Sequence, residues 1–193
     1  MYRFEIINKL IKDNKYKKYL EIGVNNAANI NQIKCKKITG VDPEPEVQKY
    51  FPKCHIVTSD TFFAVNDETY DIIFIDGLHH AEQVHNDILN ALDCLNDGGT
   101  IVCHDMKPRS YEAQLVPRIQ KVWNGDCWYA WIKLRTERND LKMFVVDTDE
   151  GCGIITQGEQ IKLKIVEEIN YKNLVINEKK WLNLISVNEF KAL

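Results

Sequence analysis

Apolar residues along this chain form short continuous runs that alternate with stretches of helical spacing. The clearest run covers residues 70–75 and is almost unbroken, as in strands that are covered on both faces of a sheet. Apolar residues then step by three and four from Ala81 to Leu95, which predicts a helix stopped by the Asn-Asp-Gly-Gly sequence of 96–99. The apolar run at 100–103 predicts the next strand.

The same order of strands and helices occurs in the preceding residues. An apolar stripe predicts an amphipathic helix over 4–11. Further strands are predicted at 19–23, 38–41 and 55–58, and short helices at 27–30 and 46–51. This alternation indicates a parallel sheet with helices on both faces, in which ligands gather beyond the carboxyl ends of the strands.

The pattern changes in the second half of the chain. Helices are predicted over 115–122 and over 128–132, the second capped by Asp126. Strands at 143–146 and 153–156 are joined by a loop short enough for an antiparallel hairpin at the edge of the sheet.

Residues 161–169 fit a strand in one part and a helix in another, and the pattern does not decide between them. The predicted fold class is therefore α/β, a Rossmann-like, doubly wound and mostly parallel sheet with an antiparallel edge hairpin. We assign residues 1–158 to one domain and residues 159–193 to a C-terminal extension packed on it.

Composition and charge argue against nucleic acid and membranes as partners. The 193 residues include 25 Lys and Arg against 28 Asp and Glu, a formal charge of −3, so no broad cationic field is available for nucleic acid. The six cysteines contain no C-x-x-C pair, and we interpret them as free thiols in a reducing compartment. No apolar stretch approaches the ~20 residues of a membrane span, so we expect a cytoplasmic protein. The edge hairpin and a tail rich in Trp and Leu are compatible with a homodimer.

Acidic residues follow the first predicted strands. The turn Glu21-Ile-Gly23 has one glycine where a dinucleotide-binding turn has three, and its carboxylate would oppose a pyrophosphate, so NAD is disfavoured. Together with Asp42 and Asp60, Glu21 would place negative charge around a ligand at the sheet edge. This charge suits a cationic cofactor such as S-adenosylmethionine. The alternative is that a glycine and an acid after a strand only form a capped turn.

A second group of polar residues ends the two clearest strands. Asp76 follows 70–75 and Asp105 follows 100–103, so the two carboxylates should lie within reach of one another and either repel or share a cation. Oxygen ligands favour magnesium, manganese or calcium over zinc. His104 is either a third ligand or a structural hydrogen-bonding group. His79, on the turn into the next helix, is a candidate general base, or else a capping or surface histidine.

The order of these motifs resembles class I S-adenosylmethionine-dependent methyltransferases, and more narrowly the small bacterial type associated with sugar and glycan biosynthesis. The resemblance covers residues 19–108, with weaker support at 143–155. The motifs that carry it are Glu21-Ile-Gly23, Gly40-Val-Asp42-Pro43, Ser59-Asp60, Phe74-Ile-Asp76-Gly-Leu-His79, Asn96-Asp-Gly-Gly99 and His104-Asp105.

The resemblance assigns a role to each motif. It implies that the cofactor pocket is lined by Glu21, Gly23, Asp42, Ser59, Asp60 and Asp76. It also implies magnesium or manganese on Asp76 and Asp105, with His104 as a further candidate ligand, and a base at His79. The chain departs from the family pattern at Ala27, where a second glycine is usual, so that a methyl group is added close to the methionine part of the cofactor. It departs again at His104-Asp105, which replaces an acid-acid or Asp-Asn pair.

The expected function is methyl transfer from S-adenosylmethionine to a hydroxyl of a sugar or glycan-related small molecule. The alternatives are a methyltransferase that needs no metal and a cofactor-binding module without turnover that acts as a partner or scaffold. A nicotinamide dehydrogenase is the least favoured. Trp123, Trp128 and Trp131 could stack on a sugar ring or lie in the core.

Overall fold

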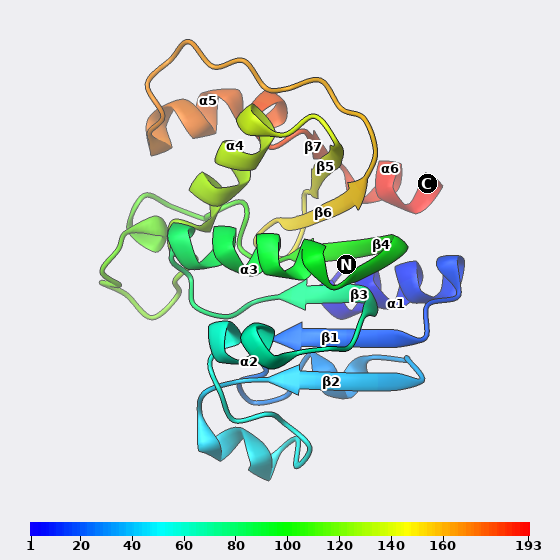
Figure 1. Cartoon of the computed structure of the whole chain (residues 1–193). Coiled ribbons are helices and arrows are strands. Elements are labelled where there is room, and N and C mark those ends of the chain that lie inside the picture. The colour runs from blue at the N-terminus through cyan, green and yellow to red at the C-terminus, as the bar shows by residue number, and fades with distance from the viewer.

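The computed structural model describes residues 1–193 and contains one mixed sheet of seven strands in the order β2-β1-β3-β4-β6-β5-β7 (Figure 1). The strands are β1 (Lys18–Ile22), β2 (Lys37–Val41), β3 (Tyr70–Ile75), β4 (Leu95–Cys103), β5 (Leu141–Val146), β6 (Cys152–Gln157) and β7 (Leu184–Ile185). Strands β2, β1, β3 and β4 are parallel, and β6 pairs antiparallel with both β4 and β5. The predicted Rossmann-like fold is confirmed.

Helices cover both faces of this sheet. They are α1 (Arg3–Asn14), α2 (Ser59–Val65), α3 (Ala81–Asp93), α4 (Cys127–Glu137), α5 (Tyr171–Trp181) and α6 (Val187–Ala192). Successive side chains of a strand point to opposite faces. Accordingly Ile73 and Ile75 of β3 pack in the cluster that contains α3, α4 and α5, while Ile72 and Phe74 pack with α1 and α6. The sheet is therefore buried on both sides, which explains the unbroken apolar run of β3.

Several predicted helices and strands are absent or shorter. The helix predicted at 27–30 is a turn followed by a single 3₁₀ turn at Ile30–Gln32, and the helix at 46–51 is a 3₁₀ segment, Pro45–Lys49. The strand at 55–58 is reduced to one bridge between His55 and Val41, and Ser59 begins α2. Two backbone hydrogen bonds join His55 to Gly40 and Asp42, and no further pairs follow to extend them into a ladder.

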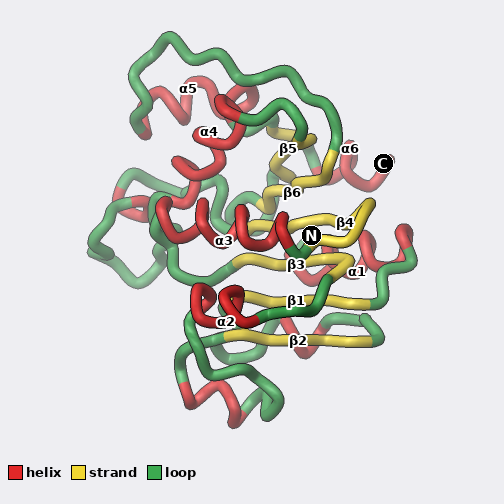
Figure 2. Tube along the Cα trace, in the orientation of Figure 1, coloured by secondary structure: helices red, strands yellow, loops and turns green.

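The helix predicted over 115–122 is also wrong. This segment is irregular, as the loop before α4 in Figure 2 shows, and Ile119 and Val122 are 61% and 50% exposed. Two predicted boundaries also differ from the structure: α3 ends at Asp93, and residues 96–99 belong to the start of β4. Asp126 precedes α4, but its carboxylate accepts a hydrogen bond from the backbone N–H of Ala81 instead of capping its own helix.

The C-terminal residues complete the sheet. The antiparallel hairpin forms as predicted, but the two-residue strand β7 pairs with β5 and becomes the edge. Residues 158–170 contain no regular helix or strand. Trp181 of α5 is fully buried in the core beside Trp128 and Trp131. All six cysteines are free, and none of the helices is long and apolar enough to cross a membrane.

Candidate active site

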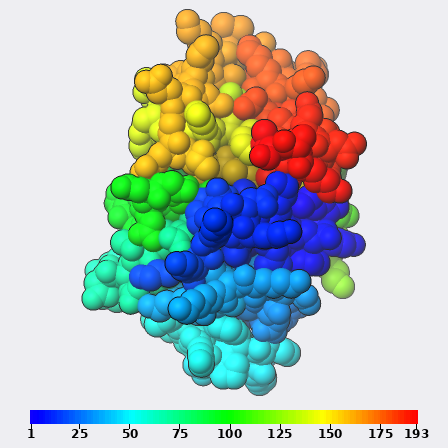
Figure 3. Space-filling model, turned by 90° about the vertical axis from the view of Figure 1, so that its right-hand side faces the viewer, coloured from blue at the N-terminus to red at the C-terminus, as the bar shows by residue number.

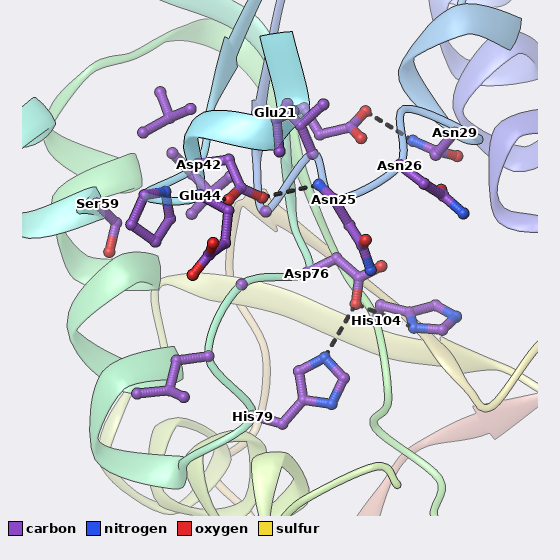
Figure 4. A pocket seen from close by; sticks show the side chains of 18 of the residues that line it. Glu21, Asn25, Asn26, Asn29, Asp42, Glu44, Ser59, Asp76, His79 and His104 are labelled. Carbon is purple, nitrogen blue, oxygen red and sulfur yellow. Dashed lines mark hydrogen bonds and ion pairs between the residues drawn. The ribbon is translucent and has the colours of Figure 1, made fainter. Parts of the chain in front are cut away.

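A cavity of about 1010 Å³ opens at the carboxyl ends of β1, β2, β3 and β4 (Figure 4). This volume is at the upper end of the ~300–1,000 Å³ that is usual for small-molecule sites. The parallel strands bring nine sequence-predicted residues to its wall, namely Glu21, Gly23, Asp42, Ser59, Asp60, Asp76, His79, His104 and Asp105.

The first turn is fixed by close backbone packing. Gly23 has a φ of +87°, and a side chain there would meet the carbonyl oxygen of Asp76 at 2.1 Å, so only glycine fits. Ala27 also has a positive φ, 59°, the conformation that glycine adopts most easily. Its methyl group is completely buried in the core and does not line the cavity. The expectation that this methyl group approaches the methionine part of a cofactor is therefore not supported.

Glu21, the last residue but one of β1, is buried and has uncharged hydrogen-bond partners. The hydroxyl of Tyr19 and the amide of Asn29 both donate to its Oε2 atom, the amide at 2.8 Å. Burial raises the pKa of Glu21 to about 8, although these two hydrogen bonds act in the opposite direction. No hydrogen bond uses Oε1, so this oxygen remains available to a ligand in the cavity.

Asp42 shapes the loops around the first two strands. Its Oδ2 accepts from the backbone N–H of Asn25 at 2.7 Å, and its Oδ1 accepts from that of Glu44 at 2.9 Å. On the neighbouring wall, the amide of Gln83 donates to Ser59 at 3.2 Å and to Asp60 at 3.0 Å. These bonds hold acidic side chains at the places where the sequence motifs predicted a cofactor pocket.

Two aspartates and two histidines form a cluster at the ends of β3 and β4. His79 Nε2 lies 3.3 Å from Asp76 Oδ1, and His79 Nδ1 lies 3.3 Å from Asp105 Oδ2. His104 Nδ1 lies 3.3 Å from Asp76 Oδ1 and 3.1 Å from Asp105 Oδ2. Both imidazoles therefore lie between the same two carboxylates, which Figure 4 shows for Asp76.

Within this cluster, the pKa of Asp76 is lowered and the pKa values of the two histidines are raised. Burial alone would raise the pKa of Asp76, but His104 and then His79 hold it well below its usual range. Burial opposes the charging of His104, yet Asp76 and Asp105 raise its pKa well above its ordinary value. The pKa of His79 is also raised, because its hydrogen bond to Asp76 and the charge of Asp105 outweigh burial.

Side chains that sequence reasoning missed complete this part of the site. Arg3, from the first turn of α1, lies 3.8 Å from Asp76 and 3.2 Å from Asp149 of the β5–β6 loop. The amide of Asn124 donates to Asp105, and Trp123 stacks on His79 with ring centroids 5.3 Å apart. Arg3, Asn124 and Asp149 belong to none of the predicted motifs, so no sequence signal marked them, whereas Trp123 had been named as a candidate for stacking on a sugar ring.

The three tryptophans named as candidates for sugar stacking lie in different parts of the structure. Trp128 and Trp131 are fully buried in the core, whereas Trp123 lines the cavity. Only Trp123 could contact a bound molecule there.

The donor atoms permit a divalent cation. One ligand atom each from Asp76, His79 and Asp105 lie within 4.8 Å of one another, as do those of a second group formed by His104, Asp149 and Cys152. Two carboxylates and one imidazole are a chemically suitable set for magnesium or manganese, with the carboxylates as the stronger ligands. His104 Nδ1 lies near Asp76 and Asp105 of the first group, but His104 also belongs to the second group. Its assignment as a metal ligand therefore stays a prediction.

A protein-family model matches one part of the chain. Residues 20–106 match the family model of a methyltransferase domain. A search of the curated proteins gave no match.

Solved structures share the fold at low sequence identity. An SAH-bound methyltransferase from Podospora anserina has 18% identity and a TM-score of 0.61 over 81% of this chain and 78% of that one. An O-methyltransferase from Bacillus cereus in complex with SAH has 12% identity and a TM-score of 0.59 over 82% and 80%. The N-methyltransferase NodS from Bradyrhizobium japonicum has 17% identity and a TM-score of 0.56 over 80% and 93%.

The family match and the fold confirm the predicted resemblance to class I S-adenosylmethionine-dependent methyltransferases. The expected enzyme class, a methyltransferase, is confirmed with them.

Proposed function

We propose that this methyltransferase transfers a methyl group from S-adenosylmethionine to a hydroxyl of a small molecule, with a sugar or glycan-related compound as the expected acceptor. The observation that carries the proposal is the position of His79, which lies between Asp76 and Asp105 on the wall of the cavity. A methyltransferase that acts on oxygen benefits from such a base, because a neutral hydroxyl is a weak nucleophile.

The opposite wall supports a cationic methyl donor. Glu21, Asp42 and Asp60 line it, and Gly23 lets the backbone approach a ligand closely. When bound, the cofactor supplies a methyl group activated by a positively charged sulfur atom. The buried carboxyl groups of Glu21 and Asp42 and the exposed carboxylate of Asp60 favour that charge. The proposed cofactor-binding residues are Glu21, Gly23, Asp42, Ser59, Asp60 and Asp76.

The hydrogen bonds of His79 indicate which of its nitrogen atoms takes the proton. Its Nδ1 lies 3.2 Å from the carbonyl oxygen of Trp123, which can only accept a hydrogen bond. In the neutral form that acts as the base, the proton is held on Nδ1, which also faces Asp105. Nε2, 3.3 Å from Asp76 Oδ1, takes the hydroxyl proton, and the carboxylate of Asp76 then accepts a hydrogen bond from the new N–H. The acceptor oxygen would bind next to Nε2, where the aromatic ring of Trp123 covers the imidazole.

Asp76 and Asp105 also fit a magnesium or manganese ion, with His104 as a candidate third ligand. Such an ion would lower the pKa of a hydroxyl bound to it. The alternative without metal has its own support, because Arg3, His79 and His104 already surround the two carboxylates with nitrogen atoms. Treatment with EDTA separates the two. We expect a loss of activity of at least about tenfold that magnesium or manganese restores, and full activity after EDTA would support the metal-independent enzyme.

The main test uses SAH calorimetry and methyl transfer from labelled S-adenosylmethionine to a panel of sugars and phenols. His79→Ala should lose roughly 10²–10⁴-fold of activity, as expected for a general base, and keep its affinity for SAH. His80→Ala is the matched control, since this neighbouring imidazole has no contact with either aspartate. Unchanged turnover in His79→Ala would remove this residue from the mechanism. Binding of SAH without labelled product from any acceptor would favour the non-catalytic module.

The pH profile gives a second readout of the same base. Because its carboxylate neighbours raise the pKa of His79, the neutral form that can accept a proton becomes common only above the ordinary histidine range. The rate of methyl transfer should therefore rise with pH through that range and beyond it. A rate that is independent of pH between 6 and 9 would contradict the assignment.

A further inference from the structure

Arg3 is the only residue of α1 that reaches the cavity. The helix lies on the opposite face of the sheet from α3, and Figure 3 shows the N-terminal residues against the C-terminal segment of the chain. Because Arg3 is the first helical residue, its side chain leaves the helix at the end nearest the strand tips. Its backbone N–H donates to Asp149 at 2.7 Å, which fixes the start of the helix on the β5–β6 loop.

The guanidinium of Arg3 is only partly used by the protein. Nη1 donates to both carboxylate oxygens of Asp149, at 3.3 and 3.2 Å, and lies 3.3 Å from Nε2 of His104. Nε is buried and has no hydrogen-bond acceptor, since its nearest carboxylate oxygen, on Asp76, is 3.8 Å away. No hydrogen bond uses Nη2 either. Nε and Nη2 form the side-on fork that binds a carboxylate through two parallel hydrogen bonds.

Buried donors in folded proteins are almost always paired, so the unpaired Nε indicates an acceptor supplied by a ligand, with the unused Nη2 beside it. The position of Arg3 indicates which part of a ligand this is. The charge of Arg3 is close enough to lower the pKa of Glu21, whose Oε1 is free to accept a hydrogen bond. The cavity therefore has a free acceptor and a free cationic donor near one another, which matches the ammonium and carboxylate of an α-amino acid.

The other arginine of the cavity wall is placed differently. Arg118 donates to the backbone carbonyls of Gln120 and Lys121 in its own loop and lies 5.8 Å from the ring centroid of Trp123. It belongs to the side of the cavity where His79 and the methyl acceptor are proposed to meet. Arg3 is thus the arginine that can serve the amino-acid end of the cofactor.

We propose that Arg3 binds the α-carboxylate of S-adenosylmethionine through Nε and Nη2, with Asp149 holding its Nη1. This inference rests on the proposed function, and it assigns the amino-acid end of the methyl donor to the space between α1 and the tips of β1 and β3. The N-terminal helix is then part of the cofactor site, although the match to the methyltransferase family begins only at residue 20.

Calorimetry with two ligands tests the assignment. The first is SAH, and the second is the SAH analogue in which hydrogen replaces the carboxylate, so that only this group differs. Arg3→Met should weaken SAH binding roughly ten- to a hundredfold and leave the affinity for the analogue within about twofold, as expected for a hydrogen bond to a charged group. Arg3→Lys keeps the charge but loses the fork, and should give an intermediate loss for SAH alone. Lys12→Met, at an exposed position of the same helix, is the control.

The outcomes separate the two levels of the proposal. If the wild-type protein binds neither ligand, the proposed function fails. If the wild type binds SAH and the Arg3 variants bind it equally well, or lose both ligands to the same degree, Arg3 does not bind the carboxylate and only supports the loop through Asp149. Thermal unfolding of each variant identifies loss of folding, and Arg3→Lys then provides the comparison if Arg3→Met is unfolded.

Discussion

Glu21, one residue before the end of β1, and Asp76, directly after the neighbouring strand β3, line one cavity, yet their pKa values move in opposite directions. Glu21 has neutral partners, Tyr19 and Asn29, so burial dominates and raises its pKa to about 8. Asp76 has Arg3, His79 and His104 around it, and the histidines lower its pKa against the effect of burial. The strand ends place both carboxylates, but the loops and α1 decide whether each one carries a charge.

This difference divides the cavity into two functional parts. The Glu21 side can change its charge near neutral pH in response to a cationic ligand. The Asp76 side keeps a fixed negative charge that orients imidazoles. A bound methyl donor would lie between them, with its sulfonium facing carboxylates from both.

The strongest test of this contrast is Asp76→Asn. The substitution removes the charge that faces Arg3, His79 and His104, and loss of one partner from a buried charge cluster costs about 3–5 kcal/mol of folding stability. Activity should fall by at least about 10²-fold because His79 loses its orientation. Denaturant unfolding and labelled methyl transfer measure the two effects.

Asp147→Asn is the control for Asp76→Asn. Asp147 is half exposed and pairs with Lys107 on the surface, where such pairs contribute about 0–1 kcal/mol. Equal stability of Asp76→Asn and the wild-type protein would show that the charges around Asp76 are screened and that the contrast with Glu21 is small.

The next test is the pH response of Glu21, with Glu21→Gln as the comparison. The folded-state pKa of about 8 lies above that of the unfolded chain, so folding favours the protonated form. The contribution of Glu21 to stability is fully present below its unfolded pKa, declines as pH rises, and is lost above about 8. The wild type should therefore lose about 1 kcal/mol or more relative to Glu21→Gln between pH 5 and pH 9.

Ligand binding should show the opposite slope. A cationic ligand favours the ionised carboxylate, so the affinity of the wild type for S-adenosylmethionine should increase from pH 6 to pH 8, and that of Glu21→Gln should not. Parallel curves for the two proteins in both measurements would mean that Glu21 does not titrate in this range. Unfolding curves at several pH values and calorimetry supply the data.

The contrast also explains how much of the site the sequence could predict. Asp76, His104 and Asp105 were identified because parallel strands end at one sheet edge, and the pairing of Ile75 with Cys103 brings the following residues together. A local motif and one topological rule were sufficient for these residues.

Arg3 and Asp149 were missed because their contact joins residues 146 positions apart, which no local pattern encodes. The loop of 107–126 was misread for a different reason. Leu115, Ile119 and Val122 have helical spacing, but two of them are exposed and none packs in the core. Apolar spacing predicts a helix only where the apolar face is buried, so the part of the cavity proposed for the acceptor was the least predictable.

The smallest expected effect belongs to Ala27→Gly, which tests whether the first turn influences the ligand side at all. Glycine relieves the left-handed backbone of Ala27, a gain of about 1–2 kcal/mol, but it removes a buried methyl group worth about 0.8 kcal/mol and adds freedom to the unfolded chain worth about 0.4–1 kcal/mol. These terms nearly cancel, so stability should change by less than about 1 kcal/mol. The affinity for SAH should stay the same, because the methyl group points into the core.

Ala28→Gly, at an exposed position that lines the cavity, is the control and should only lose stability. A large gain in affinity for Ala27→Gly would mean that its methyl group restrains the loop that faces Glu21, and the charge environment of Glu21 would then depend on this turn as well as on Tyr19 and Asn29.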